Sequence, residues 1–195
     1  AIVAKHQLNF KNMFDKKYTD IMIDIETTDV TPTAGILSIA AIPFEIWSGK
    51  IHQSPFYAAL DVQEQLDNGR TMSLDTMKWW FGQDLEIRRN AFSGKSKLHH
   101  RLADLKLFIN DYCDENVRVW ANSPSFDLVI IKNACGNKFD MWHYSQERDV
   151  HTYGQIFPEL ISELDLQPTH DPVMDCKDQI SEVMSIYERV YLKEI

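Results

Sequence analysis

Apolar residues in the first sixty positions follow patterns that predict three closely spaced strands. The segment 20–26 is mostly apolar although acidic residues interrupt it, and Ile36–Phe44 is a near-continuous apolar run of strand length. A third strand is expected over Ser54–Leu60, after a turn at Ser48-Gly49. Because the links between these strands are short, we expect them to form an antiparallel meander.

From residue 73 onward the spacing of apolar residues becomes helical. Ser73 is expected to cap a helix that carries Trp79 and Trp80, because a serine side chain can accept a hydrogen bond from a free backbone N–H. A second amphipathic helix is expected to end near Asp114. Its apolar residues are Leu98, Leu102, Leu105, Ile109 and Tyr112. A central strand is expected over Val117–Ala121.

The next segments predict a helix, a short strand and another helix. Ser123 and Pro124 are expected to begin a helix with Asp127 in its first turn, since proline suits the start of a helix. Residues 148–153 fit a short strand, and residues 153–164 fit a modest helix.

The last helix completes an α/β pattern. Asp171 is expected to cap this helix, with Pro172 at its first position. Its predicted buried stripe consists of Cys176, Ile180, Val183, Tyr187, Val190 and Tyr191. The order of elements predicts a mixed sheet covered by helices, in which an antiparallel meander joins later parallel strands. Residues 1–195 are expected to form a single domain, with residues 1–17 as a loosely held lead-in.

The composition is that expected of a soluble protein of the cytoplasm. The chain has 195 residues and three widely separated cysteines without a Cys-x-x-Cys pair, which fits free thiols in a reducing compartment. No apolar run approaches the roughly 18 residues of a membrane span, so no membrane partner is expected. The formal net charge of −9 argues against a general nucleic-acid coat, but not against an enzyme that reaches phosphates through metal ions.

Two carboxylates stand out in the first strand. Asp24 and Glu26 are two residues apart, so their side chains are expected on one face while Ile23 and Ile25 pack on the other. Like charges held so close raise one another's pKa, and a divalent metal ion relieves this repulsion. Taken alone, the pair fits an exposed edge strand at least as well as it fits a metal site.

Three further residues are candidates for the same site. Asp127 is expected at the start of a helix, and His170 and Asp175 flank the start of the last helix. Taken singly, each has a simpler explanation, since acidic residues are favoured in the first turn of a helix and His170 can belong to a capping turn. The combination of these residues, rather than any one of them, indicates a site.

In combination the motifs resemble those of the DEDDh, or proofreading-exonuclease-like, superfamily. The matching residues, in order, are Asp24-x-Glu26, Asn122 before Phe126-Asp127, and His170-x-x-x-x-Asp175. Within the superfamily the chain looks most like the branch of phage exonuclease A and the exoribonuclease-like domains labelled exonuclease VIII, judged by Thr76–Trp80, Gln83 and Trp120–Asn122. The chain departs from the usual pattern at Asp29, where glycine is common, and at Pro172 and Cys176, where alanine is frequent.

The resemblance implies an RNase H-like fold with a five-stranded mixed sheet flanked by helices. It also implies a 3′ to 5′ exonuclease that hydrolyses phosphodiester bonds and releases nucleoside 5′-monophosphates. By the matching positions, Asp24, Glu26 and Asp175 would hold one ion, and Asp24 would bridge to a second ion near Asp127. Hard oxygen ligands favour Mg²⁺ or Mn²⁺, and two such ions suit in-line displacement at phosphorus. His170 would take the proton of the attacking water as general base.

The substrate is expected to be a single-stranded nucleic acid with a free 3′ end. Adjacent Trp79 and Trp80 diverge on a helix, so we expect one to pack in the core and the other to stack on a base, although tryptophans are more often core residues. By resemblance, Thr27, Thr28 and Asn122 are candidates for contact with the terminal nucleotide, with a simple turn as the alternative for the threonines.

The sequence leaves several alternatives open. It does not indicate whether the sugar of the substrate is ribose or deoxyribose. A homodimer is common among small relatives, although no apolar surface stripe requires one. The alternative functions are a nucleic-acid or nucleotide-binding module of the same fold that has lost turnover, which the intact acids argue against, and a purely structural interaction domain.

Overall fold

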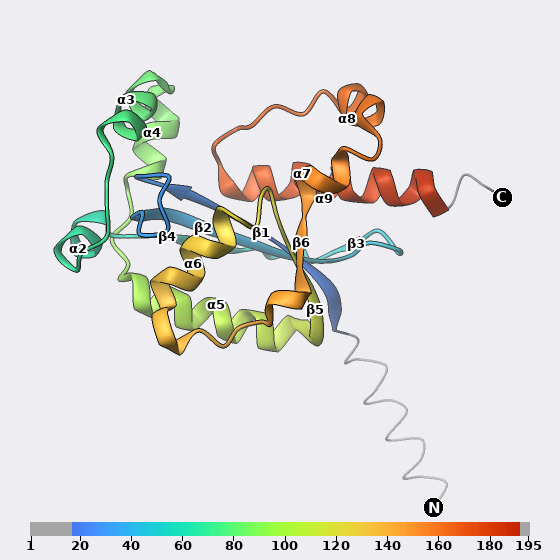
Figure 1. Cartoon of the computed structure of the whole chain (residues 1–195), viewed down its shortest axis with the longest axis horizontal. Coiled ribbons are helices and arrows are strands. Elements are labelled where there is room, and N and C mark those ends of the chain that lie inside the picture. Colours follow the sequence, from blue (N-terminus) through green and yellow to red (C-terminus); the bar gives the residue numbers. More distant parts are fainter. Residues whose placement is uncertain (1–16, 192–195) are drawn as a thin grey trace, which may run out of the picture.

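A mixed sheet forms the centre of the molecule in the computed structural model, which describes residues 17–191 (Figure 1). Within these residues the sheet has six strands: β1 (Tyr18–Thr27), β2 (Ile36–Glu45), β3 (Lys50–Ile51), β4 (Phe56–Ala59), β5 (Cys113–Ala121) and β6 (Glu147–Asp149). The strand order is β3-β2-β1-β5-β6, and β4 also pairs with β2. β1 is antiparallel to β2 and parallel to β5, so the predicted α/β class and mixed sheet are confirmed.

The sheet has six strands rather than the expected five, because β3 and β4 both pair with β2. β3 pairs with the end of β2 at Phe44 and Glu45, whereas β4 pairs with residues 38–41 of β2. Both strands therefore share the edge of β2 that faces away from β1. The expected strand Ser54–Leu60 corresponds to β4, and β3 was not predicted because two residues carry no readable period.

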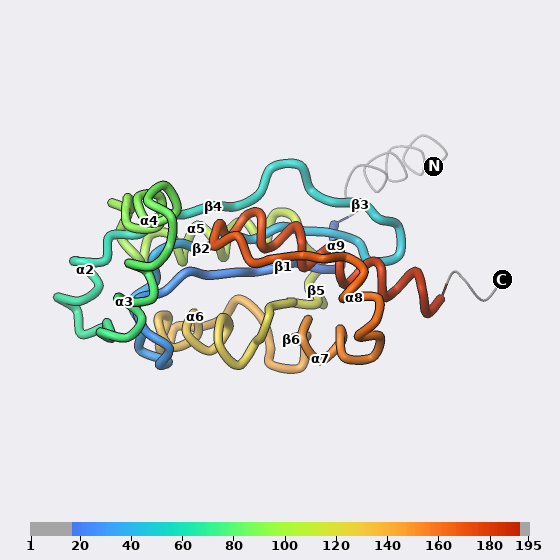
Figure 2. The backbone as a smooth tube through the Cα atoms, turned by 90° about the horizontal axis from the view of Figure 1, so that it is seen from above, coloured from blue at the N-terminus to red at the C-terminus, as the bar shows by residue number. Residues whose placement is uncertain are grey.

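Helices cover both faces of the sheet. The helices are α2 (Val62–Asp67), α3 (Leu74–Gly82), α4 (Leu85–Ala91), α5 (Leu98–Tyr112), α6 (Asp127–Cys135), α7 (Val150–Gly154), α8 (Pro158–Leu164) and α9 (Pro172–Tyr191), with short 3₁₀ turns at Gly136–Lys138 and Tyr144–Gln146. α5 and α9 lie on opposite sides of the sheet in Figure 1, and the view from above shows α9 crossing β1 and β2 (Figure 2).

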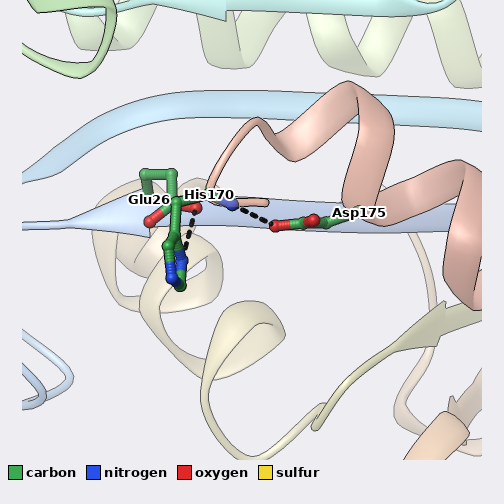
Figure 3. A group of neighbouring side chains, drawn as sticks. All are labelled: Glu26, His170 and Asp175. Carbon is green, nitrogen blue, oxygen red and sulfur yellow. Dashed lines mark hydrogen bonds and ion pairs between the residues drawn. The ribbon is translucent and has the colours of Figure 1, made fainter. Parts of the chain in front are cut away.

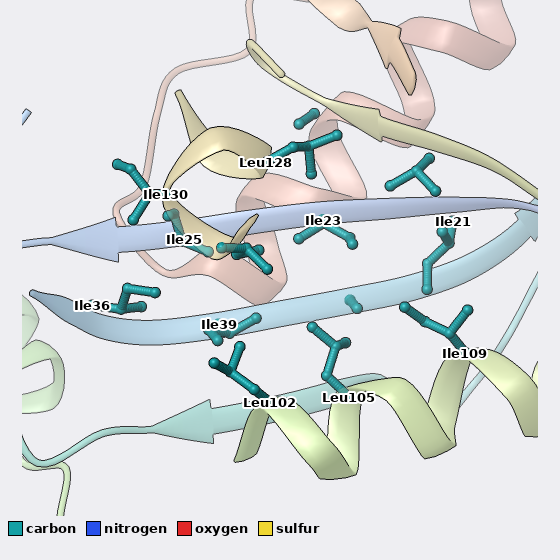
Figure 4. Packing of buried hydrophobic residues seen from close by; sticks show 14 of the residues in the cluster. Ile21, Ile23, Ile25, Ile36, Ile39, Leu102, Leu105, Ile109, Leu128 and Ile130 are labelled. Atoms are coloured by element: carbon teal, nitrogen blue, oxygen red, sulfur yellow. The ribbon is translucent and has the colours of Figure 1, made fainter. Parts of the chain in front are cut away.

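The larger core lies between the sheet and helices α5 and α6. The isoleucines of β1 and β2 meet the leucines of these helices there (Figure 4). A second core lies between the other face of the sheet and α9, where Met22 and Ile42 pack against Cys176 and Ile180. Thus β1 is buried on both faces, which explains why its sequence is apolar apart from the acids.

The beginning of α9 agrees with the prediction and its end does not. Asp171 Oδ1 accepts hydrogen bonds from the backbone N–H groups of Val173 (2.9 Å) and Met174 (3.2 Å), and Pro172 is the first helical residue. Ile186 is completely buried, whereas Tyr191 is 60% exposed. The buried stripe therefore continues through Ile186 rather than through Tyr191.

Three other local predictions are wrong. The strand expected over residues 148–153 is only β6, because the chain turns into α7 at Val150. The helix expected over residues 153–164 is two helices, and Pro158 starts the second. Ser123 does not cap α6 with its side chain, since its hydroxyl bonds to Ser125 and the helix begins at Asp127. The short helices α2 and α4 were not predicted.

The described residues cover 17–191, so the expected lead-in at residues 1–17 lies outside them except for Lys17. Among the helices of the described part, none combines the length and apolar character that are needed to cross a lipid bilayer.

Candidate active site

Strand β1 presents two different faces, as the alternation of its residues predicts. Ile23 and Ile25 are buried in the core with α5 and α6. Asp24 and Glu26 point to the face that α9 covers, where Asp24 is partly buried and Glu26 is 9% exposed. An exposed edge strand is therefore excluded, because β1 pairs with strands on both sides.

Asp127 reaches the same place from the first residue of α6. The pairing of β1 with β5 reaches only as far as Met22 and Trp120, so the later N–H groups on that side of β1 need other acceptors. Asp127 Oδ1 accepts the N–H of Ile25 at 3.2 Å. Its other oxygen, Oδ2, is buried and has no hydrogen-bond partner among the described residues.

Asp175 fixes the loop that carries His170. Its carboxylate accepts hydrogen bonds from the backbone N–H and the hydroxyl of Thr169, both at 2.7 Å, and from the backbone N–H of His170 at 3.0 Å. His170 has a φ of 58°, in the left-handed region that non-glycine residues seldom adopt. Its imidazole lies toward Glu26, with 3.9 Å between Nδ1 and Oε1 (Figure 3).

These side chains share one pocket of about 280 Å³. It brings together Asp24, Glu26, Asn122, Asp127, His170 and Asp175, all of which the sequence singled out. It also contains Asp178, Gln179 and Glu182, which sequence reasoning missed. Their spacing from Asp175 could have identified them, because residues three, four and seven positions after Asp175 lie on the same face of a helix.

The pocket is unfavourable for negative charge. Burial raises the pKa of Glu26 to about 8, and the carboxylates of Asp175 and Asp127 add to the effect. Burial likewise raises the pKa of Asp127 to about 7. The pKa of Asp24 is raised by burial, and further by Asp127 and Glu26. A divalent cation would relieve these repulsions, because it favours the ionised form of each carboxylate.

The ligand atoms fit a hard divalent cation. One ligand atom each from Glu26, His170 and Asp175 lies within 4.8 Å of the others. Carboxylate oxygens suit Mg²⁺ and Mn²⁺, and the unpartnered Oδ2 of Asp127 is a further oxygen that can accept a ligand bond. From the sequence, Asp24 was expected to hold one ion together with Glu26 and Asp175. In the described residues Asp24 lies in the same pocket but outside this cluster, and its Oδ1 accepts a hydrogen bond from Gln179.

The two tryptophans of α3 separate as predicted. Trp80 is 2% exposed, and its indole N–H donates to the carbonyl oxygen of Thr27 at 2.9 Å. Trp79 is 44% exposed and lines a groove of about 650 Å³ that also includes Glu26 and Thr27. The rings of Trp79 and His170 meet edge to face at 4.7 Å. Trp79 is therefore the tryptophan with a ring surface available beside the carboxylates.

The remaining candidates for substrate contact do not all reach the site. Thr27 lines the groove and Asn122 is exposed in the carboxylate pocket. Thr28 is completely buried, and its hydroxyl donates to the carbonyl oxygens of Gly35 and Thr71. The expected contact of Thr28 with substrate is thus wrong, because this residue holds the turn after β1.

Asp29 replaces the usual glycine without strain. The non-glycine residues with positive φ in the described chain are Asp165 and His170, so Asp29 does not need a left-handed backbone. Its carboxylate accepts hydrogen bonds from the N–H of Val30 at 2.7 Å and the hydroxyl of Thr31 at 3.2 Å. The side chain therefore stabilises the turn that a glycine would form by flexibility.

Several known nucleases resemble the chain. A family model described as "3'-5' exoribonuclease Rv2179c-like domain" matches residues 19–187. No curated protein sequence matches the chain. Among solved structures, cell-death related nuclease 4 (CRN-4) has a TM-score of 0.60 at 12% identity, covering 89% of this chain and 65% of CRN-4. The RNase domain of the yeast Pop2 protein has a TM-score of 0.57 at 10% identity, covering 96% of this chain and 83% of that domain.

These likenesses bear on the fold and the superfamily. At such low identities the structural matches show a shared RNase H-like fold, as the sequence motifs implied. The chain spans less than two thirds of CRN-4. Together with the family match, the shared fold supports the DEDDh exonuclease superfamily. The narrower resemblance to the phage exonuclease A branch stays a prediction.

Proposed function

We propose that the chain, which belongs to the 3′-5′ exoribonuclease Rv2179c-like domain family, is a 3′ to 5′ exonuclease that shortens single-stranded RNA in a reaction that depends on divalent metal ions. The observation that supports the metal dependence most strongly is the pocket itself. It gathers six carboxylates and a histidine from three separate parts of the chain. Such a concentration of buried negative charge is unfavourable unless cations offset it.

The proposed roles follow from the positions of the side chains. Asp24, Glu26, Asp127 and Asp175 would hold two Mg²⁺ or Mn²⁺ ions, which when bound activate a water molecule and stabilise the leaving 3′ oxygen. His170 lies beside Glu26 at the edge of the pocket and would accept the proton of the attacking water. The phosphodiester bond then breaks at the 3′ oxygen and releases a nucleoside 5′-monophosphate.

The groove beside these acids supports a single-stranded nucleic acid as the substrate. The exposed ring of Trp79 lies next to His170, where an unpaired terminal base can stack on it. Thr27 lines the same groove and Asn122 lies in the carboxylate pocket, so both are candidates for contact with the terminal nucleotide. RNA is preferred in the proposal because the matching family is one of exoribonuclease domains.

One assay tests the class, the polarity and the sugar together. Matched 5′-labelled single-stranded RNA and DNA are incubated with the protein in Mg²⁺, Mn²⁺ or EDTA, and products are resolved by length. We expect a ladder that shortens from the 3′ end, faster for RNA, with no products in EDTA. Asp24→Ala is the negative control, and its fold is checked by circular dichroism. Internal cleavage, activity in EDTA, or full activity of Asp24→Ala would contradict the proposal.

A further inference from the structure

Gln179 is a pocket residue with an unusual set of contacts. It lies on α9 one turn after Asp175 and is 9% exposed. Its side-chain Nε2 donates a hydrogen bond of 2.8 Å to Asp24 Oδ1. Its amide oxygen, Oε1, is buried and has no hydrogen-bond partner among the described residues.

Gln65, another buried glutamine, shows what a purely structural amide looks like in this fold. Gln65 is 1% exposed, and its Oε1 accepts the backbone N–H of Ile36 at 2.8 Å. Its Nε2 donates to the carbonyl oxygen of Ile36 at 2.7 Å and to that of Asp61 at 3.1 Å. Both ends of this amide are satisfied by backbone groups, so it links α2 to β2.

Gln179 differs from Gln65 at both ends. Its donor is used on a carboxylate of the site rather than on the backbone, and its acceptor is left without a partner. A buried amide oxygen without a partner is costly in an ordinary core, so its retention needs an explanation. The explanation that fits the position is a partner that arrives with the bound ions, such as a water molecule coordinated to one of them.

We infer that Gln179 is a positioning residue that orients Asp24 for metal binding and offers its amide oxygen to a water molecule of the ion. This inference rests on the proposed function of the same site. The hydrogen bond from Gln179 fixes Oδ1 of Asp24, and Oδ2 would then be the oxygen that binds the ion. Hydrogen bonds to metal ligands act in this way, and their loss typically weakens metal binding about 10-fold to 100-fold.

The test compares Gln179→Met with Gln65→Met, since methionine is close to glutamine in length and removes both amide functions. Mn²⁺ alone is titrated into each metal-free protein by calorimetry, and RNA cleavage is measured over a range of Mn²⁺ concentrations. For Gln179→Met we expect Mn²⁺ binding about 10-fold to 100-fold weaker, a cleavage rate that excess Mn²⁺ restores, and a preserved unfolding temperature. For Gln65→Met we expect a lower unfolding temperature and unchanged Mn²⁺ binding.

The possible results separate this inference from the proposed function. Equal Mn²⁺ binding by the wild type and Gln179→Met overturns the inference, and so does a rate that excess Mn²⁺ fails to restore. A wild type that binds Mn²⁺ but does not cleave RNA refutes the proposed function, while the calorimetry still decides the inference. A wild type that binds no Mn²⁺ overturns both. Gln179→Leu is the second variant if methionine disturbs the fold.

Discussion

Replacement of Asp127 by asparagine should make the metal-free protein more stable while it removes activity. Asparagine keeps an oxygen for the N–H of Ile25, which Asp127 Oδ1 accepts in the structure. Its amide nitrogen replaces Oδ2, the buried oxygen without a partner, and adds a donor among neighbouring carboxylates. The substitution therefore removes a buried charge and retains the contact that ties α6 to β1.

The size of the effect follows from the pKa of Asp127. Burial raises this pKa from the ordinary 3.8 to about 7. A difference of this size corresponds to about 4 kcal/mol lost when the folded protein ionises, at 1.36 kcal/mol per pKa unit. Because the unfolded chain ionises first, the metal-free wild type loses stability as pH rises from about 4 to about 7, and Asp127→Asn does not incur this loss.

The assay is urea unfolding of both proteins in EDTA, repeated at pH 4 and pH 8. We expect similar free energies of unfolding at pH 4. At pH 8 we expect the free energy of unfolding of Asp127→Asn to be higher by up to about 4 kcal/mol. In a thermal unfolding experiment on a chain of this size, this difference would raise the midpoint temperature by roughly 10 °C. Saturating Mn²⁺ should stabilise the wild type by about 2.7 kcal/mol at one hundred times Kd, and the variant by less.

Two results would refute this reasoning. If Asp127→Asn unfolds more easily than the wild type at pH 8 in EDTA, the carboxylate contributes a stabilising contact that the structure does not contain. If the difference between the two proteins is the same at both pH values, ionisation of Asp127 is not its source.

Three further predictions concern the groove, the general base and one close backbone approach. Trp79→Ala should raise KM for RNA about 5-fold to 150-fold with the fold intact, because stacking on one base is worth about 1 to 3 kcal/mol, and an unchanged KM removes this role. His170→Asn, which suits the left-handed backbone, should slow cleavage about 10²-fold to 10⁴-fold while calorimetric Mn²⁺ binding persists; a full rate would argue against the general base. Gly94→Ala should destabilise the protein by about 1 to 3 kcal/mol, because its Cβ would lie 2.2 Å from the backbone nitrogen of Leu60. Gly82→Ala is the matched control with no atom within 4 Å, and equal unfolding midpoints for the two variants would contradict the steric argument.

The sequence predicted best those features that depend on a strong local period. The faces of β1 followed from strict alternation, and the start of α9 followed from an aspartate before a proline. The convergence of Asp127 and Asp175 on that strand came from the resemblance of the motifs rather than from any local pattern. Spacing in the sequence does not predict that residues 102 positions apart, such as Ile25 and Asp127, share a hydrogen bond.

The features that were missed depend on tertiary contacts. Thr27 and Thr28 are adjacent and identical, so only the fold of the turn decides which one lines the groove. Helical spacing places Gln179 on the same face as Asp175, but its role in the pocket was not predicted because a glutamine on a helix is usually solvated. β6 is three residues long and ends at Asp149, and the next residue, Val150, is buried in the second core. Short elements carry too few residues for periodicity to separate strand from helix.

The double-sided β1 strand makes this protein sensitive to insertions in one short stretch. Asp24 pairs with Ala40 and Glu26 with Ser38, so the register with β2 determines which residues face α9. One residue inserted between positions 20 and 24 would exchange the faces of everything that follows in the strand. The carboxylates would then enter the isoleucine core and isoleucines would line the pocket. This one-residue shift of the strand would thus abolish folding and the proposed catalysis together. An insertion in the loop between β1 and β2 need not alter either face of the strand.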